Sequence, residues 1–128
     1  MPLVRISIPA GKGDAFAKAV SESVHDAMVQ TIDAPQADRF QVITEHAPGW
    51  LIVDPTYLGV DRSVEALIVH ITLRAGRPNE KKRALYRVIA DNLHARLGIR
   101  KQDVMIVLAE NESIDWSFGN GEAQYAKD

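Results

Sequence analysis

The chain has 128 residues, of which 46% are hydrophobic and 25% charged, and this balance is typical of a single soluble globular domain over residues 1–128. A formal net charge of −2, without any run of five Lys or Arg residues, argues against nucleic acid or an anionic membrane as a partner. The absence of cysteine excludes a thiolate nucleophile and a Cys-type zinc site, and no signal peptide or membrane span is predicted, so we expect a cytoplasmic protein.

The first predicted element is a strand over residues 2–8, which is rich in Val and Ile and begins with Pro2. Cells usually remove Met1 when so small a residue follows it, and removal would leave Pro2 with a free secondary amine. An α-amino group titrates at about 7.7–8.0, so charges around it decide whether it acts as a base or as an acid. The alternative interpretation is structural, because proline at the start of a strand loses no hydrogen bond.

Helix and strand patterns then alternate along the chain. Apolar residues recur at helical spacing from Phe16 to Ile32, and four segments follow, predicted as a strand (38–45), a turn (46–49), a short strand (50–53) and a loop (54–59). From residue 66 the order begins again, with a strand (67–73), a break (75–78), a helix that starts at Pro78 and ends before Gly98, and a strand (103–108).

An ungapped offset of 65 residues aligns residues 1–46 with residues 66–111. It pairs Gly11 with Gly76 in the turns and Asp38 with Asp103 near the second strands. Chance similarity does not easily match strands, stripes and turns in one register. The sequence therefore predicts an internal repeat of two β-α-β units.

The repeat predicts an α+β fold. Two right-handed β-α-β units side by side give a four-stranded, mainly parallel sheet with both helices on one face, followed here by a short C-terminal hairpin. The opposite face is expected to be apolar as well, because the apolar residues of the first strand do not strictly alternate with polar ones. No further helix is available to cover it, so we expect several copies of the chain to associate through that face.

The turn after the first strand differs between the two copies. Pro9 and Lys12 in the first copy correspond to Arg74 and Arg77 in the second. Two guanidiniums at a helix start can bind a carboxylate or phosphate, since each donates two parallel hydrogen bonds and the helix N-terminus adds partial positive charge. Solvated turn arginines are the alternative. In the same alignment Pro2 corresponds to a leucine of the second copy. The terminal proline therefore occurs only in the first half of the chain and the arginine pair only in the second.

The tail over residues 111–122 carries Trp116 and Phe118 among polar residues and glycines. Two interpretations stay open: a hairpin that packs on a neighbouring subunit, and an apolar wall over a small site. The histidines show no ligand spacing, so no metal site is predicted. No Ser-His-Asp pattern, phosphate-binding loop or dinucleotide fingerprint is present either.

Taken together, these features resemble the tautomerase superfamily, and within it the malonate semialdehyde decarboxylase-like group. The resemblance runs over essentially the whole chain. It is carried by the repeat and by four local features: Pro2 after Met1, Asp38-Arg39-Phe40-Gln41, His46-Ala47-Pro48-Gly49, and Trp116-Ser117-Phe118-Gly119.

The resemblance implies a homotrimer of duplicated β-α-β chains that needs no cofactor. Pro2 would transfer a proton on a small oxo carboxylic acid, with Asp38 as the nearby aspartate. The carboxylate would be held by Arg74 and Arg77, and the aromatic wall would be Trp116 and Phe118. The decarboxylases of the group place their arginines two residues apart, whereas Arg74 and Arg77 are three apart, as in the haloacrylate dehalogenase branch.

The leading hypothesis is therefore keto-enol tautomerisation. Decarboxylation of a β-oxo acid such as malonate semialdehyde, or hydration of an unsaturated acid, is the alternative activity, since all three use a carboxylate clamp beside an amine. A hypothesis from a different class is a non-catalytic oligomeric protein that binds an anion.

Overall fold

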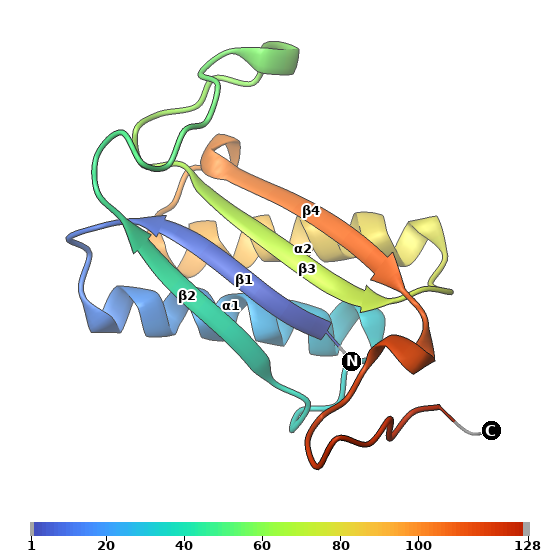
Figure 1. The fold of residues 1–128 in the computed structure, drawn as a ribbon. Coiled ribbons are helices and arrows are strands. Elements are labelled where there is room, and N and C mark those ends of the chain that lie inside the picture. Colours follow the sequence, from blue (N-terminus) through green and yellow to red (C-terminus); the bar gives the residue numbers. More distant parts are fainter. Residues whose placement is uncertain (1, 127–128) are drawn as a thin grey trace.

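The computed structural model describes residues 2–126 and consists of one four-stranded sheet with two helices packed on the same face (Figure 1). The strands are β1 (Pro2–Pro9), β2 (Phe40–His46), β3 (Leu67–Arg74) and β4 (Val104–Asn111), and the helices are α1 (Asp14–Ile32) and α2 (Asn79–Leu97). The strand order is β2-β1-β3-β4; β1–β2 and β3–β4 are parallel, and β1–β3 is antiparallel. The predicted α+β fold is confirmed.

The bounds of β1 and β3 differ by 65 residues at both ends, and so do those of α1 and α2. The two units meet through the antiparallel β1–β3 pair, in which Pro2 lies opposite Leu73 and Ser7 opposite Ile68. The amino end of β1, which begins the first unit, therefore lies beside the carboxyl end of β3, which begins the second unit.

The hydrophobic core lies between the sheet and the helices. In β1 and β3 burial alternates with period two, so every second side chain points at the helices. The buried hydrophobic residues of the two strands are Val4, Ile6, Ile8, Leu67, Val69, Ile71 and Leu73, and those of the helices include Val20, Val24, Met28, Leu85, Ile89 and Leu93. Pro2, at the start of β1, is buried as well. This pattern holds both helices on one face of the sheet.

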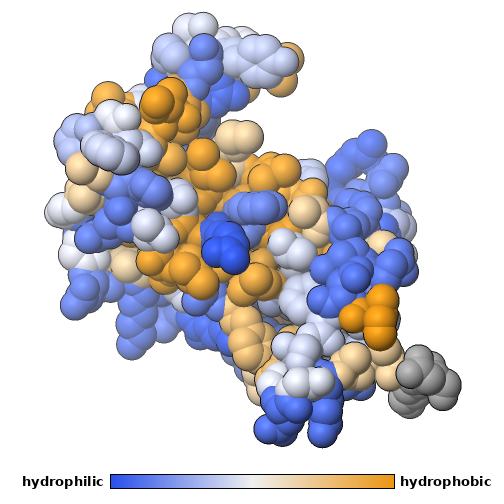
Figure 2. All heavy atoms as spheres, viewed as in Figure 1, coloured by the Kyte–Doolittle hydropathy of each residue, from blue (hydrophilic) through white to orange (hydrophobic). Residues whose placement is uncertain are grey.

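The open face of the sheet carries apolar side chains that the chain itself does not cover (Figure 2). Phe40 and Val42 of β2 and Met105 and Val107 of β4 are each 41–46% exposed. The face is mixed at its centre, because Arg5 of β1 points outward there. The expected apolar face is therefore found along both edge strands but not at the centre of the sheet.

Two predicted elements are absent. Residues 50–53 form no strand, because they lie in an arm (residues 47–66) that projects beyond the sheet, where Trp50 and Ile52 are more than 80% exposed (Figure 1). The described tail residues 112–126 form no hairpin; a 3-10 turn (Ser113–Asp115) and loops held by side-chain hydrogen bonds replace it.

Smaller differences concern Pro78 and His25. Pro78 is the N-cap of α2 and precedes its first helical residue. The place of His25 on a predicted amphipathic helix leads us to expect it at the surface or at its boundary, but it is fully buried, and its Nε2 lies 2.9 Å from the carbonyl oxygen of Gln36. Within residues 2–126, neither helix is long and apolar enough to cross a membrane.

Truncating the core side of α2 should destabilise the fold. Ile89 is fully buried, so Ile89→Ala should lower the free energy of unfolding by about 2–5 kcal/mol through lost burial and the cavity left behind. Urea denaturation at a fixed protein concentration measures the change. The matched control Ile114→Ala, at a residue 62% exposed, should shift it by less than about 0.5 kcal/mol. Equal effects of the two substitutions would contradict this account of the core.

Candidate functional site

The antiparallel pairing of β1 and β3 gathers residues from all four strands at one end of the sheet (Figure 1). Pro2 lies opposite Leu73, the neighbour of Arg74. On the other side of β1, Leu3 pairs with Phe40, the first residue of β2. Arg74 in turn pairs with Asn111, the last residue of β4. The amino end of β1, the start of β2 and the ends of β3 and β4 thus border one small region.

Asp38 enters this region from the turn before β2. Its backbone N–H donates to the carbonyl oxygen of Pro35 at 3.0 Å, and both of its carboxylate oxygens are shielded from solvent. The negative charge of Asp38 is one of the charges that act on the Arg77 guanidinium. Asp38 and Arg77, which are far apart in the sequence, therefore lie within electrostatic reach of each other.

Arg77 is bound to the backbone of both units. Its Nε donates to the carbonyl oxygen of Ile32 at 3.4 Å, and its Nη1 donates to the carbonyl oxygen of Arg74 at 3.0 Å. Burial lowers the pKa of Arg77, and the positive charge of Arg74 lowers it further, whereas the carboxylates of Asp33, Glu110 and Asp38 oppose the shift. An arginine remains protonated in spite of such a shift, so two cationic groups stand next to each other.

Arg74 is exposed at the end of β3 and is held from the tail. Its Nη1 donates to the hydroxyl of Ser113 at 3.4 Å, and its guanidinium carbon lies 5.7 Å from the ring centroid of Tyr125. The tail runs back past the amino end of β1 after leaving β4 (Figure 1). Arg74 therefore contacts Ser113 and Tyr125, two residues of the tail, and the strand pattern of the sequence does not predict either contact.

The tail aromatics form one cluster on the start of β2. Trp116 stacks on Phe118 with ring centroids 5.5 Å apart, and Phe118 contacts Phe40 at 5.4 Å and Tyr125 at 5.2 Å. The indole N–H of Trp116 donates to the Oδ1 of Asn111 at 2.7 Å. The two aromatic residues singled out in the sequence are thus linked to Arg74 through one neighbour each, Trp116 through Asn111 and Phe118 through Tyr125. Sequence reasoning missed Phe40, although it lies in the predicted strand over residues 38–45, and Tyr125, which lies beyond the tail segment 111–122.

This arrangement can bind a small anion and surround its apolar part. The guanidinium of Arg74 can donate paired hydrogen bonds to a carboxylate, and the rings of Trp116 and Phe118 exclude water from one side. A free amine on Pro2 would add a group that exchanges protons near neutral pH. The described residues contain no cluster of three or more His, Asp or Glu side chains able to hold a metal ion.

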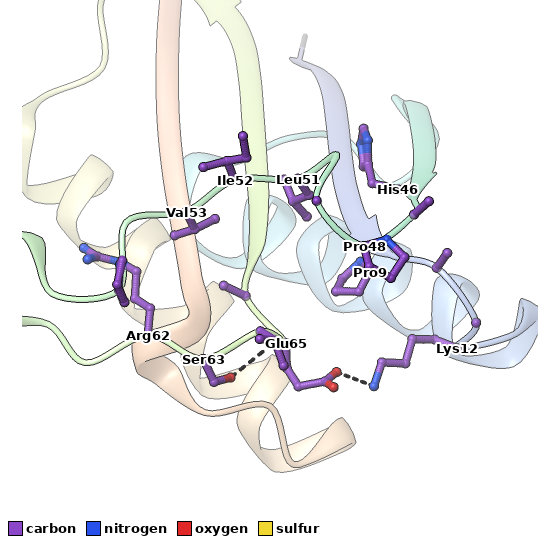
Figure 3. A pocket seen from close by; sticks show the side chains of 17 residues that line it. Pro9, Lys12, His46, Pro48, Leu51, Ile52, Val53, Arg62, Ser63 and Glu65 are labelled. Atoms are coloured by element: carbon purple, nitrogen blue, oxygen red, sulfur yellow. Dashed lines mark hydrogen bonds and ion pairs between the residues drawn. The ribbon is translucent and has the colours of Figure 1, made fainter.

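A hollow lies at the opposite end of the sheet, under the arm (Figure 3). It has a cavity volume of about 860 Å³ and is lined by residues that include Pro9, Lys12 and His46. At about 3.3 Å per residue, the eight residues of β1 separate Pro2 from Pro9 by roughly 23 Å. None of the six site residues predicted from the sequence lines this cavity.

The charged and hydroxyl side chains of that cavity already have protein partners. Lys12 forms an ion pair with Glu65, drawn in Figure 3, and the hydroxyl of Ser63 donates to Asp103 at 2.7 Å. Arg62 donates to the carbonyl oxygens of Asp54 and Tyr57, both at 3.0 Å, and so holds the arm in shape. These groups are engaged in holding the arm in place. We therefore take the Pro2 end of the sheet as the candidate site.

Two family models, each described as tautomerase enzyme, match residues 2–61 and 38–119 of the chain. Among curated proteins, the probable tautomerase YusQ of Bacillus subtilis (strain 168) is 44% identical over 97% of this chain and 98% of its own length. The similarity extends through both units and most of the tail.

Solved structures agree with the family models. Malonate semialdehyde decarboxylase, described with decarboxylase and hydratase activities, superposes with a TM-score of 0.90 at 33% identity, over 96% of this chain and 95% of the other. A fused 4-OT described as a symmetric trimer gives a TM-score of 0.78 at 31% identity, covering 96% and 97% of the two chains. With the duplicated fold and the family models in agreement, the chain belongs to the tautomerase superfamily, close to the malonate semialdehyde decarboxylase-like group.

Proposed function

We propose that the chain is a cofactor-independent tautomerase in which the amine of Pro2, freed by removal of Met1, transfers a proton on a small oxo carboxylic acid. The observation that carries the proposal is the antiparallel β1–β3 pair, which brings the start of β1 next to the strand that ends in Arg74. Met1 itself lies outside the described residues, and its removal is part of the proposal.

Each group has its own role in the proposed reaction. Arg74 and Arg77 bind the carboxylate of the enol form, and Trp116 and Phe118 cover the rest of the molecule. The neutral Pro2 nitrogen accepts the proton of the enol hydroxyl and returns a proton to the neighbouring carbon, so the product is the keto acid and nothing else is consumed. Asp38 positions the amine or an associated water molecule.

The charges around the amine set its protonation state. The guanidiniums of Arg74 and Arg77 lower the pKa of a nearby amine and favour the neutral base, whereas the carboxylate of Asp38 raises it and favours a cationic acid. A base role suits tautomerisation. A cationic Pro2 would polarise a carbonyl and suit decarboxylation or hydration, and the likeness to malonate semialdehyde decarboxylase favours this as the second candidate activity.

We further propose that the protein acts as a homotrimer. The partly exposed apolar side chains of Phe40, Val42, Met105 and Val107 support association of copies through the open face. The similarity to a fused 4-OT described as a trimer supports the number of copies.

Removal of the secondary amine should cost most of the turnover. Pro2→Ala keeps a terminal amine but changes its basicity and position, so kcat on phenylpyruvate enol should fall about 10²- to 10⁴-fold. Malonate semialdehyde is assayed in parallel, and the faster wild-type reaction separates the two candidate activities. Pro48→Ala, in the arm, is the control. If Pro2→Ala leaves both rates unchanged, proline catalysis is wrong.

Intact-mass measurement of the same preparations tests the first requirement. We expect the mass of the chain without Met1 in both the wild type and Pro2→Ala. A chain that retains Met1 has an amide at Pro2 and no titratable amine there. Turnover by such a preparation would contradict the proposed mechanism, and carboxylate binding without turnover would favour the non-catalytic anion-binding protein.

Loss of one guanidinium should weaken substrate binding. Arg74→Ala should lower kcat/KM about 10- to 100-fold, mainly through KM, because a hydrogen bond to a charged group contributes about 1.5–3 kcal/mol. Arg87→Ala, at an exposed position of α2, is the matched control and should leave both constants unchanged. An unchanged KM in Arg74→Ala would remove Arg74 from the proposed clamp.

A charge on the open face should disrupt the trimer. Val107→Glu would bury an uncompensated carboxylate in the interface, so light scattering after gel filtration should show a smaller species than the wild type. Arg83→Glu, at an exposed position of α2, should leave the assembly intact. If the Val107→Glu assembly has the same molar mass as the wild-type assembly, this face is excluded as the interface.

A further inference from the structure

We infer that Tyr125 is a positioning residue, whose ring holds the guanidinium of Arg74 in the orientation that receives the substrate carboxylate. The inference rests on the proposed function and extends it to the end of the tail. Tyr125 makes no proposed contact with the substrate and acts only through Arg74.

The first observation is the contact itself. The guanidinium carbon of Arg74 lies 5.7 Å from the centroid of the Tyr125 ring, within the range of about 6 Å in which a cation is attracted to an aromatic face. The Ser113 hydroxyl at 3.4 Å is the other tail group on this side chain. An exposed arginine loses rotamer entropy when it is ordered around a ligand, so contacts that restrict it before binding lower that cost.

The second observation is that Tyr125 is itself fixed. Its ring meets Phe118 edge to face, with centroids 5.2 Å apart and an interplanar angle of 79°. The side chain of Gln124 accepts a hydrogen bond from the N–H of Phe118 and donates one to the carbonyl oxygen of Gly119, both at 2.9 Å. Tyr125 is 42% exposed, but its contact with Phe118 keeps the ring next to Arg74.

The chain reversal between Phe118 and Tyr125 depends on left-handed backbone. Gly119, Asn120 and Gly121 have φ values of 138°, 60° and 68°, which most other residues adopt only with strain. Within this reversal, the side chain of Gln124 bonds to the backbone of Phe118 and of Gly119. The local sequence of the tail therefore brings residue 125 back onto residue 118.

The third observation links this support to the sheet. Phe118 rests on Trp116 and on Phe40 of β2, whereas Arg74 belongs to β3. Tyr125 thus joins the aromatic wall to the arginine across the end of the sheet. A tail that served only as an apolar cover would need the rings of Trp116 and Phe118, but no ring next to the guanidinium.

The test compares three substitutions in the full chain. Tyr125→Leu removes the ring, Tyr125→Phe keeps it and removes only the hydroxyl, and Tyr86→Leu is the matched control at an exposed tyrosine of α2. Steady-state kinetics on phenylpyruvate enol gives KM and kcat separately. Titration with pyruvate, followed by NMR, gives Kd without turnover, and the same spectra report the Hε resonance of Arg74, identified by its absence in Arg74→Ala.

We expect Tyr125→Leu to raise KM and the pyruvate Kd about 2- to 5-fold with kcat nearly unchanged, as follows from the size of an exposed cation–π contact. Its Arg74 Hε resonance should move downfield as ring shielding is lost. Tyr125→Phe should match the wild type in all three measurements, and so should Tyr86→Leu. This rescue by Phe separates the ring contact from a role of the hydroxyl.

Unchanged or lower KM and Kd in Tyr125→Leu would overturn the inference, as would a Tyr125→Phe protein that behaves like Tyr125→Leu. If the wild type turns over substrate and Tyr125→Leu changes neither KM nor Kd, this inference is rejected and the proposed function stands. Pyruvate binding that depends on Arg74 and Tyr125, without any turnover, rejects tautomerisation and keeps the positioning role. A wild type that neither binds pyruvate nor turns over substrate rejects both.

Discussion

The antiparallel hydrogen bonding between β1 and β3 is the constraint on which the rest of the molecule depends. Each β-α-β unit alone leaves one edge of its first strand unpaired and one helix without a neighbour. Pairing these two edges satisfies both rows of backbone groups and brings α1 and α2 onto the same face, where they share one core. Because the pairing is antiparallel, it also sets the start of one unit beside the end of the first strand of the other.

That junction concentrates charge, which the surrounding structure offsets. Two guanidiniums close together repel, and burial lowers the pKa of Arg77 further. Three carboxylates act in the opposite direction, and two backbone carbonyl oxygens accept hydrogen bonds from Arg77. Arg77 therefore ties the end of α1 to the end of β3 as well as contributing positive charge. The Arg74 side chain, by contrast, contacts the side chains of Ser113 and Tyr125 in the tail.

The two ends of the sheet have different characters. At the Pro2 end the tail closes over the strands with aromatic rings that contact one another. At the opposite end the arm projects away from the sheet and leaves large apolar side chains exposed, among them Trp50, Ile52 and Leu58. Such exposure fits the association of copies proposed for the open face, since the arm cannot bury these side chains on its own sheet.

The sequence by itself determined the features that depend on local periodicity. Strand alternation, helical stripes and the shared offset predicted both β-α-β units, and the helix ends at Ile32 and Leu97 agree with the expected stops. Local patterns and the repeat singled out Pro2, the two arginines and the two tail aromatics, and the resemblance added Asp38; the roles of all six stay predictions. The antiparallel pairing of β1 with β3, the path of the tail and the contact of Tyr125 with Arg74 were decided only by the tertiary structure. All three join residues that are distant along the chain, and no local pattern specifies which strand edge or side chain will be met. The missing strand at residues 50–53 has the same cause, because a strand pattern forms a strand only where another strand lies beside it.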